Sequence, residues 1–197
     1  MNLLFIGDVV GQSGCDFLES RMYKLKREYD IDVTVVNGEN SAQGNGITPQ
    51  SYRQLLNIGA DVVTTGNHSF RRREAEELYD TNEQLLRPAN YPEGVMGHGV
   101  TYIDMCPYKI AVVNLMGTMY MEAVENPFNY VDKLLESIDT PNIIVDFHAE
   151  TTSEKKAMGF YLQKRCTAVL GTHTHVQTAD EMILGGHTAY ILSLIHI

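Results

Sequence analysis

Histidine and acidic residues recur in this sequence directly after short apolar runs. Gly171-Thr-His-Thr-His175 follows the apolar run Ala168-Val169-Leu170 and carries two histidines two residues apart. Imidazole is a common metal ligand in proteins, and alternate residues of an extended segment point the same way. If the apolar run is a strand, both imidazoles lie at its carboxyl end, where open α/β sheets bind their ligands.

Four earlier segments end in the same manner and supply further ligand types. They are Gly7-Asp8, Asn37-Gly-Glu-Asn40, Gly66-Asn-His68 and Phe147-His148, each after an apolar run rich in β-branched residues. Together with the histidine pair they offer six side chains for one two-metal site: Asp8, Glu39, Asn67, His148, His173 and His175. Nitrogen and oxygen ligands without thiolate favour iron, manganese or zinc over calcium or magnesium.

A two-metal site of this composition is suited to phosphoryl chemistry. Two ions about 3.5–4 Å apart can hold a bridging hydroxide and clamp a phosphoryl group for in-line attack. Glu39 is placed to bridge the ions because a carboxylate has two oxygens. His68 directly follows Asn67 and can protonate the leaving group as a general acid. Asn40 directly follows Glu39 and can donate to a phosphoryl oxygen or orient a ligand.

Each of these segments also has a purely structural interpretation when taken alone. Gly7-Asp8 equally fits a strand-to-helix turn, the polar residues Glu39 and Asn40 fit a solvated loop, and His148 fits a core histidine. The combined pattern favours a site, because five strand ends of one sheet would share one rim. The run Arg71–Arg73 is either the charged start of a helix or a contact to substrate phosphate.

Two acidic residues near His148 are further candidates. Asp146 and Glu150 flank it and are either partners that orient the ligands or polar residues that close the end of a strand.

The bulk composition describes an ordinary globular chain and excludes some functions. The 197 residues are 44% hydrophobic and 20% charged, which suits one domain. The net charge of −10 argues against a protein that coats long nucleic acid or an anionic membrane. The three cysteines are widely spaced and predict buried, reduced thiols rather than disulfides. Without a signal peptide or an apolar run of membrane-spanning length, we expect a cytoplasmic protein.

Apolar periodicity predicts strands that alternate with helices. The expected strands cover residues 3–6, 33–36, 61–64, 142–147 and 168–170, with hairpins over 100–115 and 182–192. One expected helix begins after residue 14 and has an inward apolar stripe from Cys15 to Tyr29. The other expected helices cover residues 48–58, 71–79, 126–138 and 153–163. Residues 85–92 are expected to be irregular. The pattern indicates a largely parallel central sheet covered by helices.

Five collinear motifs give the chain a resemblance to a known family. Together they resemble the YmdB-like branch of the calcineurin-like metallophosphoesterases, from residue 1 to about residue 191. The motifs are Gly7-Asp8-Val-Val-Gly11, Asn37-Gly-Glu-Asn40, Gly66-Asn-His68, Asp146-Phe-His-Ala-Glu150 and Gly171-Thr-His-Thr-His175 with the residues up to Asp180.

The resemblance implies a four-layer α/β/β/α sandwich, in which the hairpin strands help to build a second sheet. It also implies a dinuclear centre, usually with iron or manganese. Asp8, Glu39 and His175 would hold one metal; Glu39, Asn67, His148 and His173 would hold the other. His68 would be the proton donor.

The activity that the resemblance implies is hydrolysis of small cyclic nucleotides, 2′,3′-cyclic and in some cases 3′,5′-cyclic AMP, by metal-bridged hydroxide. The implied protein is cytoplasmic and homo-oligomeric. Two other functions fit the same residues: a phosphomonoesterase or protein phosphatase on the same centre, and a regulatory protein that senses nucleotide or RNA and has incidental activity.

Two departures from the family pattern affect these expectations. The wider superfamily opens with Asp-x-His, whereas this chain has Asp8-Val-Val, so one imidazole is missing. After Ile191 the sequence no longer resembles the family. We therefore expect an incomplete metallophosphoesterase domain at residues 1–191 that lacks the family's closing strands, and a non-family tail at residues 192–197.

Overall fold

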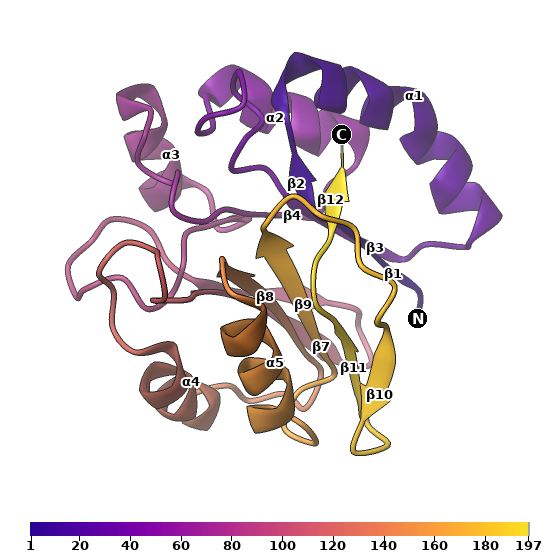
Figure 1. Cartoon of the computed structure of the whole chain (residues 1–197). Helices are drawn as coiled ribbons and strands as arrows, with labels where there is room; N and C mark the ends of the chain where they lie inside the picture. Colours follow the sequence, from indigo (N-terminus) through magenta and orange to yellow (C-terminus); the bar gives the residue numbers. More distant parts are fainter. Residues whose placement is uncertain (197) are drawn as a thin grey trace.

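Two β-sheets lie face to face between two layers of helices (Figure 1). The computed structural model describes residues 1–196. In Figure 1 the helices α1 to α3 lie above the strands and α4 and α5 lie below them. This arrangement confirms the four-layer sandwich, and it shows that the single central sheet expected from periodicity was wrong.

The first sheet is parallel and follows the order β1-β3-β4-β5. The second is mixed and follows the order β10-β11-β9-β8-β7-β6, with antiparallel hairpins at its two edges. The first sheet contains β1 (Leu3–Ile6), β3 (Val33–Asn37), β4 (Val62–Thr64) and β5 (Leu85–Leu86). The second contains β6 (Val100–Asp104), β7 (Lys109–Met116), β8 (Ile143–Ala149), β9 (Ala168–His173), β10 (Met182–Leu184) and β11 (Thr188–Ile191).

A short parallel pair stands apart from both sheets. It joins β2 (Asp8–Val9) to β12 (Ile195–His196). Residues 192–194 lie against β9, since the Leu194 N–H donates to the Gly171 carbonyl at 2.9 Å. The domain boundary at residue 191 stays a prediction.

Three apolar cores separate the four layers. One packs the first sheet against its helices and contains Leu18, Val36 and Leu55. The second fills the space between the sheets with Val35, Val62, Val112 and Ile144 among others. The third packs the second sheet against α4 and α5. The helices are α1 (Gly11–Glu28), α2 (Pro49–Ile58), α3 (Glu76–Thr81), α4 (Pro127–Glu136), α5 (Thr152–Tyr161) and the 3₁₀ turn η1 (Arg73–Ala75).

The strands of the first sheet are apolar on both faces because each face packs in a different core. In β3, Val35 faces the other sheet while Val36 faces the helices, and Val62 and Val63 divide in the same way in β4. Successive strand residues point to opposite faces, so a continuous apolar run fits a strand covered on both sides.

Three helix ends follow the expected chemistry. Thr48 caps α2, accepting from the Ser51 N–H at 3.2 Å, and Asn126 caps α4 ahead of Pro127. Gly59 ends α2 with a left-handed φ of 110°.

Several local expectations were wrong. The predicted helix over residues 71–79 is replaced by η1 and the short α3, and Leu85–Leu86 forms a strand where irregular structure was expected. Tyr29 lies beyond α1 and is exposed. Cys106 is an exposed thiol, whereas Cys15 and Cys166 are buried as expected. None of the helices in residues 1–196 has the length and apolar character of a membrane span.

Candidate metal centre

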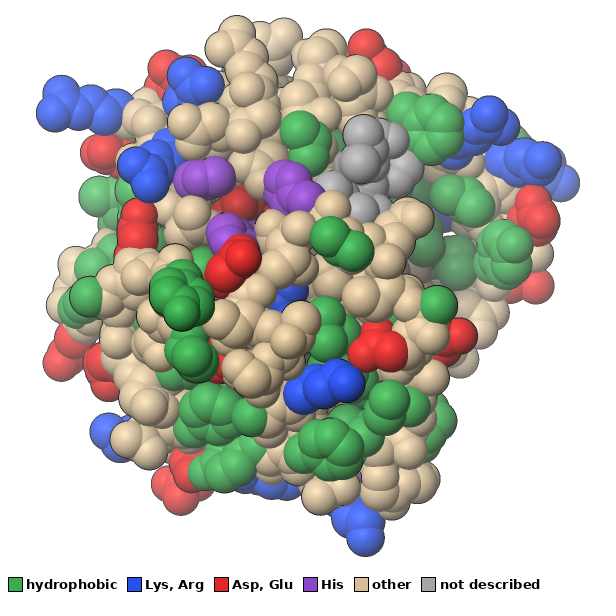
Figure 2. All heavy atoms as spheres, viewed as in Figure 1, with side chains coloured by type: hydrophobic (Ala, Val, Ile, Leu, Met, Phe, Trp, Pro, Cys, Tyr) green, Lys and Arg blue, Asp and Glu red, His purple; other side chains and the backbone are tan. Residues whose placement is uncertain are grey.

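The eight predicted site residues gather at one rim of the sandwich, and both sheets contribute to it. Asp8, Glu39 and Asn67 come from the first sheet's side, because β2 carries Asp8 and the other two follow β3 and β4. His148 and His173 end strands β8 and β9 of the second sheet. The shared rim was predicted for a single sheet; it is formed by the carboxyl ends of two facing sheets. Histidine and acidic side chains reach the surface together on the face in Figure 2.

The first group of ligand atoms surrounds Nε2 of the buried His148. This nitrogen lies 3.0 Å from Asn67 Oδ1, 3.2 Å from Glu39 Oε2 and 3.1 Å from His173 Nδ1. The ligand atoms of Glu39, His148 and His173 all lie within 4.8 Å of one another. Four donor atoms therefore converge on one small volume.

A buried relay behind His148 orients its ring. The Thr172 hydroxyl donates to Asp146 Oδ1 at 2.7 Å, so it accepts from His148 Nδ1 at 2.9 Å. This places a proton on Nδ1 and aims Nε2 at the other ligand atoms, the arrangement that metal-bound histidines use. Asp146 is itself held by Thr64 and Asn37, at 2.5 and 3.0 Å. Burial raises the pKa of Asp146 to about 6, although His148 and these hydrogen bonds oppose the rise.

His173 is oriented from the opposite side by Glu150. Its Nε2 lies 3.0 Å from Glu150 Oε2, and a carboxylate only accepts, so the proton sits on Nε2 and Nδ1 keeps its lone pair. Burial and the neighbouring His148 lower the pKa of His173 to about 4. The imidazole is therefore neutral at pH 7, as a metal ligand must be.

The second group contains Asp8 and His175. Asp8 Oδ2 accepts from the His173 backbone N–H at 3.0 Å, and Asp8 Oδ1 lies 3.5 Å from His175 Nε2. Asp8 Oδ1 is fully buried and has no hydrogen-bond partner among the described residues. The neighbouring Asp8 carboxylate raises the pKa of His175 against the effect of burial.

Glu39 and Asn40 connect the two groups. The Asn40 amide nitrogen lies 3.1 Å from Glu39 Oε1 and 3.1 Å from His175 Nε2, and its oxygen lies 2.8 Å from His68 Nδ1. Burial would raise the pKa of Glu39, but His148 and His68 outweigh it and lower that pKa, so the carboxylate is ionised. For His148, Glu39 outweighs burial and raises the imidazole pKa to about 9. Without an ion, Nε2 therefore carries a second proton at pH 7, which a bound metal ion would displace.

Two backbone features make this convergence possible. A Cβ on Gly66 would overlap the His148 ring and Glu39 Oε2, so only glycine fits between them. His173 and His175 have left-handed φ values of 92° and 52°. The segment is therefore bent, and the expectation that both imidazoles point the same way along an extended chain was wrong.

The donor set fits metal ions. A buried carboxylate oxygen without a partner is costly unless a cation or donor satisfies it, and Asp8 Oδ1 is such an atom. Imidazole and carboxylate lone pairs that face one another at about 3 Å repel unless a proton or a cation lies between them. His148, His173, Asn67 and Glu39 would hold one ion, and Asp8, His175 and Glu39 the other.

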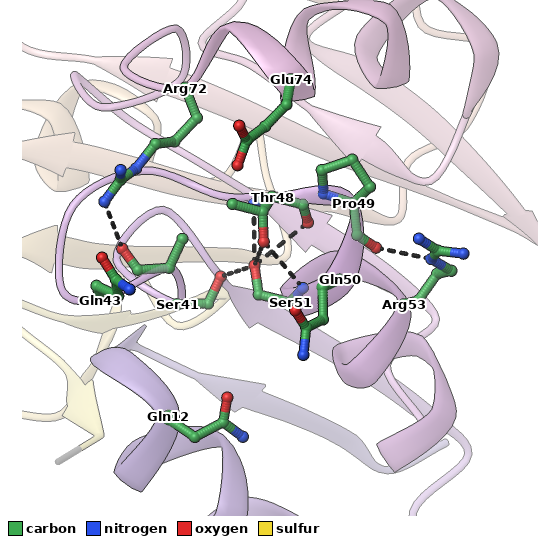
Figure 3. Close-up of a pocket in the computed structure, with 11 residues that line it drawn as sticks. Gln12, Ser41, Gln43, Thr48, Pro49, Gln50, Ser51, Arg53, Arg72 and Glu74 are labelled. Carbon is green, nitrogen blue, oxygen red and sulfur yellow. Dashed lines mark hydrogen bonds between the residues drawn. The ribbon is translucent and has the colours of Figure 1, made fainter.

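The residues around the centre also fix two neighbouring segments. Arg71 pairs with Glu122 at 3.3 Å, and Arg72 donates to the Ala42 and Asn45 carbonyls, so Arg72 ties the segment after His68 to the loop after Asn40. A cavity of ≈ 540 Å³ lies between that loop and the start of α2 (Figure 3). It is lined by the Ser41, Thr48 and Ser51 hydroxyl network and by Arg53 and Arg72 among others, and none of the eight predicted residues lines it.

Three residues that orient the centre through Asp146 were not predicted from the sequence: Thr172, Thr64 and Asn37. The sequence does contain a signal for them. In each strand, every second residue points to the other sheet, and each of these polar residues occupies such a position after apolar ones.

Comparison with known proteins identifies the family. The family profile described as "YmdB-like protein" matches residues 4–194. The chain belongs to the YmdB-like family. The 2′,3′-cyclic-nucleotide 2′-phosphodiesterase of Bacillus subtilis (strain 168) is 47% identical over 193 residues, which cover 97% of this chain and 73% of that protein.

Two solved structures agree with this assignment. A hypothetical protein from Thermus thermophilus superposes with a TM-score of 0.94 at 38% identity, covering 99% of this chain and 76% of the other. A crystal structure described as a novel phosphatase from Mycoplasma pneumoniae gives 0.93 at 33% identity, covering 98% and 71%. The YmdB-like chain is thus a metal-dependent phosphoesterase with the metallophosphoesterase fold.

Proposed function

We propose that this chain hydrolyses small 2′,3′-cyclic nucleotides on a dinuclear metal centre, with 3′,5′-cyclic AMP as a second substrate. The observation that carries the proposal is the convergence of six ligand side chains in two groups that share Glu39, with His68 beside them. The substrate class is suggested by the name of the Bacillus subtilis relative.

The first group would hold its ion through His148 Nε2, His173 Nδ1, Asn67 Oδ1 and one Glu39 oxygen. Asp8, His175 and the other Glu39 oxygen would hold the second ion. Bound metal ions would supply Lewis-acid polarisation of the phosphodiester and activation of the attacking water. Iron or manganese suits this mixed nitrogen and oxygen set best, with zinc as the alternative.

His68 is proposed as the general acid. Its Nδ1 bonds the Asn40 carbonyl oxygen at 2.8 Å, so Nδ1 carries a proton and Nε2 is the nitrogen that delivers one to the leaving oxygen. Asn40 is almost fully buried and its amide is engaged by His68, Glu39 and His175. This supports a role in orienting those residues more than direct donation to substrate, the two roles that the sequence left open.

The test is metal analysis coupled to a hydrolysis screen on the purified chain. We expect bound transition metal, and turnover of 2′,3′-cyclic AMP that is lost on chelation. His68→Ala should keep its metal and lose about 10²–10⁴-fold in kcat, the usual contribution of a general acid. His187→Ala, an exposed histidine in the β10–β11 turn, is the matched control.

The same screen separates the alternative functions. Turnover confined to phosphomonoesters or phosphopeptides would replace the phosphodiesterase proposal with a phosphatase. Nucleotide binding that persists after the metal ligands are removed would favour the sensor. Full turnover by a metal-loaded His68→Ala protein would remove the acid role. Homo-oligomerisation and a cytoplasmic location also stay predictions.

A further inference from the structure

Tyr120 is an aromatic residue whose position is not explained by folding. Its side chain is 88% exposed, and its backbone has a left-handed φ of 61°. That conformation is unfavourable for a bulky side chain, and glycine or asparagine adopts it at lower cost. A residue that strains the backbone and buries almost nothing adds no stability, so another requirement accounts for the ring.

The segment that carries Tyr120 is held firmly at the rim of the metal centre. It begins after β7, where the Gly117 N–H donates to the carbonyl of His148 at 3.0 Å. The buried Glu154 carboxylate then accepts from the Thr118 N–H at 2.9 Å and from the Met119 N–H at 3.3 Å. Tyr120 therefore projects from an anchored turn.

The residues before and after Tyr120 contact segments on two different sides of the metal centre. Before it, the Met119 sulfur accepts from the Thr151 hydroxyl at 3.7 Å, and Thr151 follows Glu150, the partner of His173. After it, Glu122 pairs with Arg71 at 3.3 Å, three residues beyond His68.

The turn thus runs from the His173 side of the centre to the His68 side, with Tyr120 between. Figure 2 shows hydrophobic side chains beside the histidines on this face.

We propose that the Tyr120 ring stacks on the base of a nucleotide whose phosphodiester lies at the metal centre. This inference rests on the proposed cyclic-nucleotide activity and adds a residue that recognises the base. A presented aromatic face suits any nucleobase, because every base has a π-face, and it favours the larger purines. The proposed metal ions would hold the phosphodiester, whereas a nucleobase carries no charge, so stacking would supply the affinity for the base.

The experiment compares two substrates that differ only in the base. One is 2′,3′-cyclic AMP, and the other is 1-O-methylribose 2,3-cyclic phosphate, which has the same reacting group. The variants are Tyr120→Ala, Tyr120→Phe, which retains the ring, and Tyr23→Ala, a control on α1 that removes another exposed tyrosine.

We expect Tyr120→Ala to raise KM for the nucleotide about tenfold relative to the base-free substrate, with little change in kcat. Tyr120→Phe should stay within about twofold of the wild type. The stacking role would be overturned if Tyr120→Ala changed KM for the nucleotide less than twofold. It would also be overturned if the variant raised KM equally for the nucleotide and for the base-free substrate. If the wild type hydrolyses neither substrate, the proposed function fails. Calorimetric titration with adenosine 2′-monophosphate then decides the stacking separately, since an equal Kd for wild type and Tyr120→Ala rejects it.

Discussion

Replacing Thr172 by valine tests whether the buried relay behind His148 prepares the metal centre. Valine keeps the shape of threonine but removes the hydroxyl. That hydroxyl accepts from His148 Nδ1 at 2.9 Å and donates to Asp146 Oδ1 at 2.7 Å, and all three side chains are fully buried. The substitution leaves an imidazole N–H and a carboxylate oxygen without these partners, in a place that water does not reach.

The magnitude follows from those two lost bonds. A hydrogen bond to a charged group contributes about 1.5–3 kcal/mol, and an orphaned buried group costs about 1–3 kcal/mol. We expect Thr172→Val to lower the free energy of unfolding of the chelated protein by about 3 kcal/mol. We also expect metal affinity to fall about 10–100-fold, the usual effect of removing a group that orients a metal ligand.

Thr34→Val is a closely matched control. Thr34 is also a fully buried strand threonine, but its hydroxyl has no partner among the described residues. Its replacement should be neutral or stabilising. Urea unfolding in chelator measures stability, and competition with a chromogenic chelator measures metal affinity. The reasoning would be refuted if Thr172→Val and Thr34→Val changed the free energy of unfolding equally, or if Thr172→Val bound metal as tightly as the wild type.

Two further predictions follow from the packing around the centre. Gly66→Ala should abolish metal binding, because the added methyl overlaps His148 and Glu39; a variant with normal metal content by elemental analysis would contradict this. Burial lowers the pKa of Lys155 from 10.5 to about 8, so between these pH values the unfolded chain binds more protons and stability rises with pH. The unfolding free energy of the chelated wild type should rise by about 3 kcal/mol relative to Lys155→Met between about pH 7 and pH 10.5. A difference that is independent of pH would show that the ammonium is not desolvated.

Much of the candidate site can be predicted because its residues follow recognisable strand ends. Apolar runs before Asp8, Glu39, Asn67, His148 and His173 place polar side chains at carboxyl ends, and parallel strands bring such ends to one rim. The helix caps at Thr48 and Asn126 are local and were predicted for the same reason.

The division into two sheets could not be derived from periodicity. A strand buried on both faces reads as a continuous apolar run whether helices or a second sheet cover it. The pairing of β3, β4 and β5 in one sheet and of β7, β8 and β9 in the other depends on contacts between residues that are far apart in the sequence. Leu85–Leu86 is too short to give a periodic signal, and the bend at His173 and His175 is set by tertiary contacts such as the bond from the His173 N–H to Asp8.

The inward faces of the strands nevertheless contain information that local motifs do not. Along β3, Val33, Val35 and Asn37 share the face toward the second sheet, and along β8 Ile144, Asp146 and His148 share the facing side. In both strands the alternation changes from apolar to polar as the rim is approached.

Polar groups inside a sandwich must find partners there, either on a neighbouring strand or on the facing sheet. Asn37 and Thr64 of the first sheet accordingly donate to Asp146 of the second. Asp146 fixes Thr172, and Thr172 fixes His148. Hydrogen bonds that join the two sheets at Asp146 therefore hold the relay that orients the metal ligand, which is why the centre depends on the sandwich and not on a single sheet.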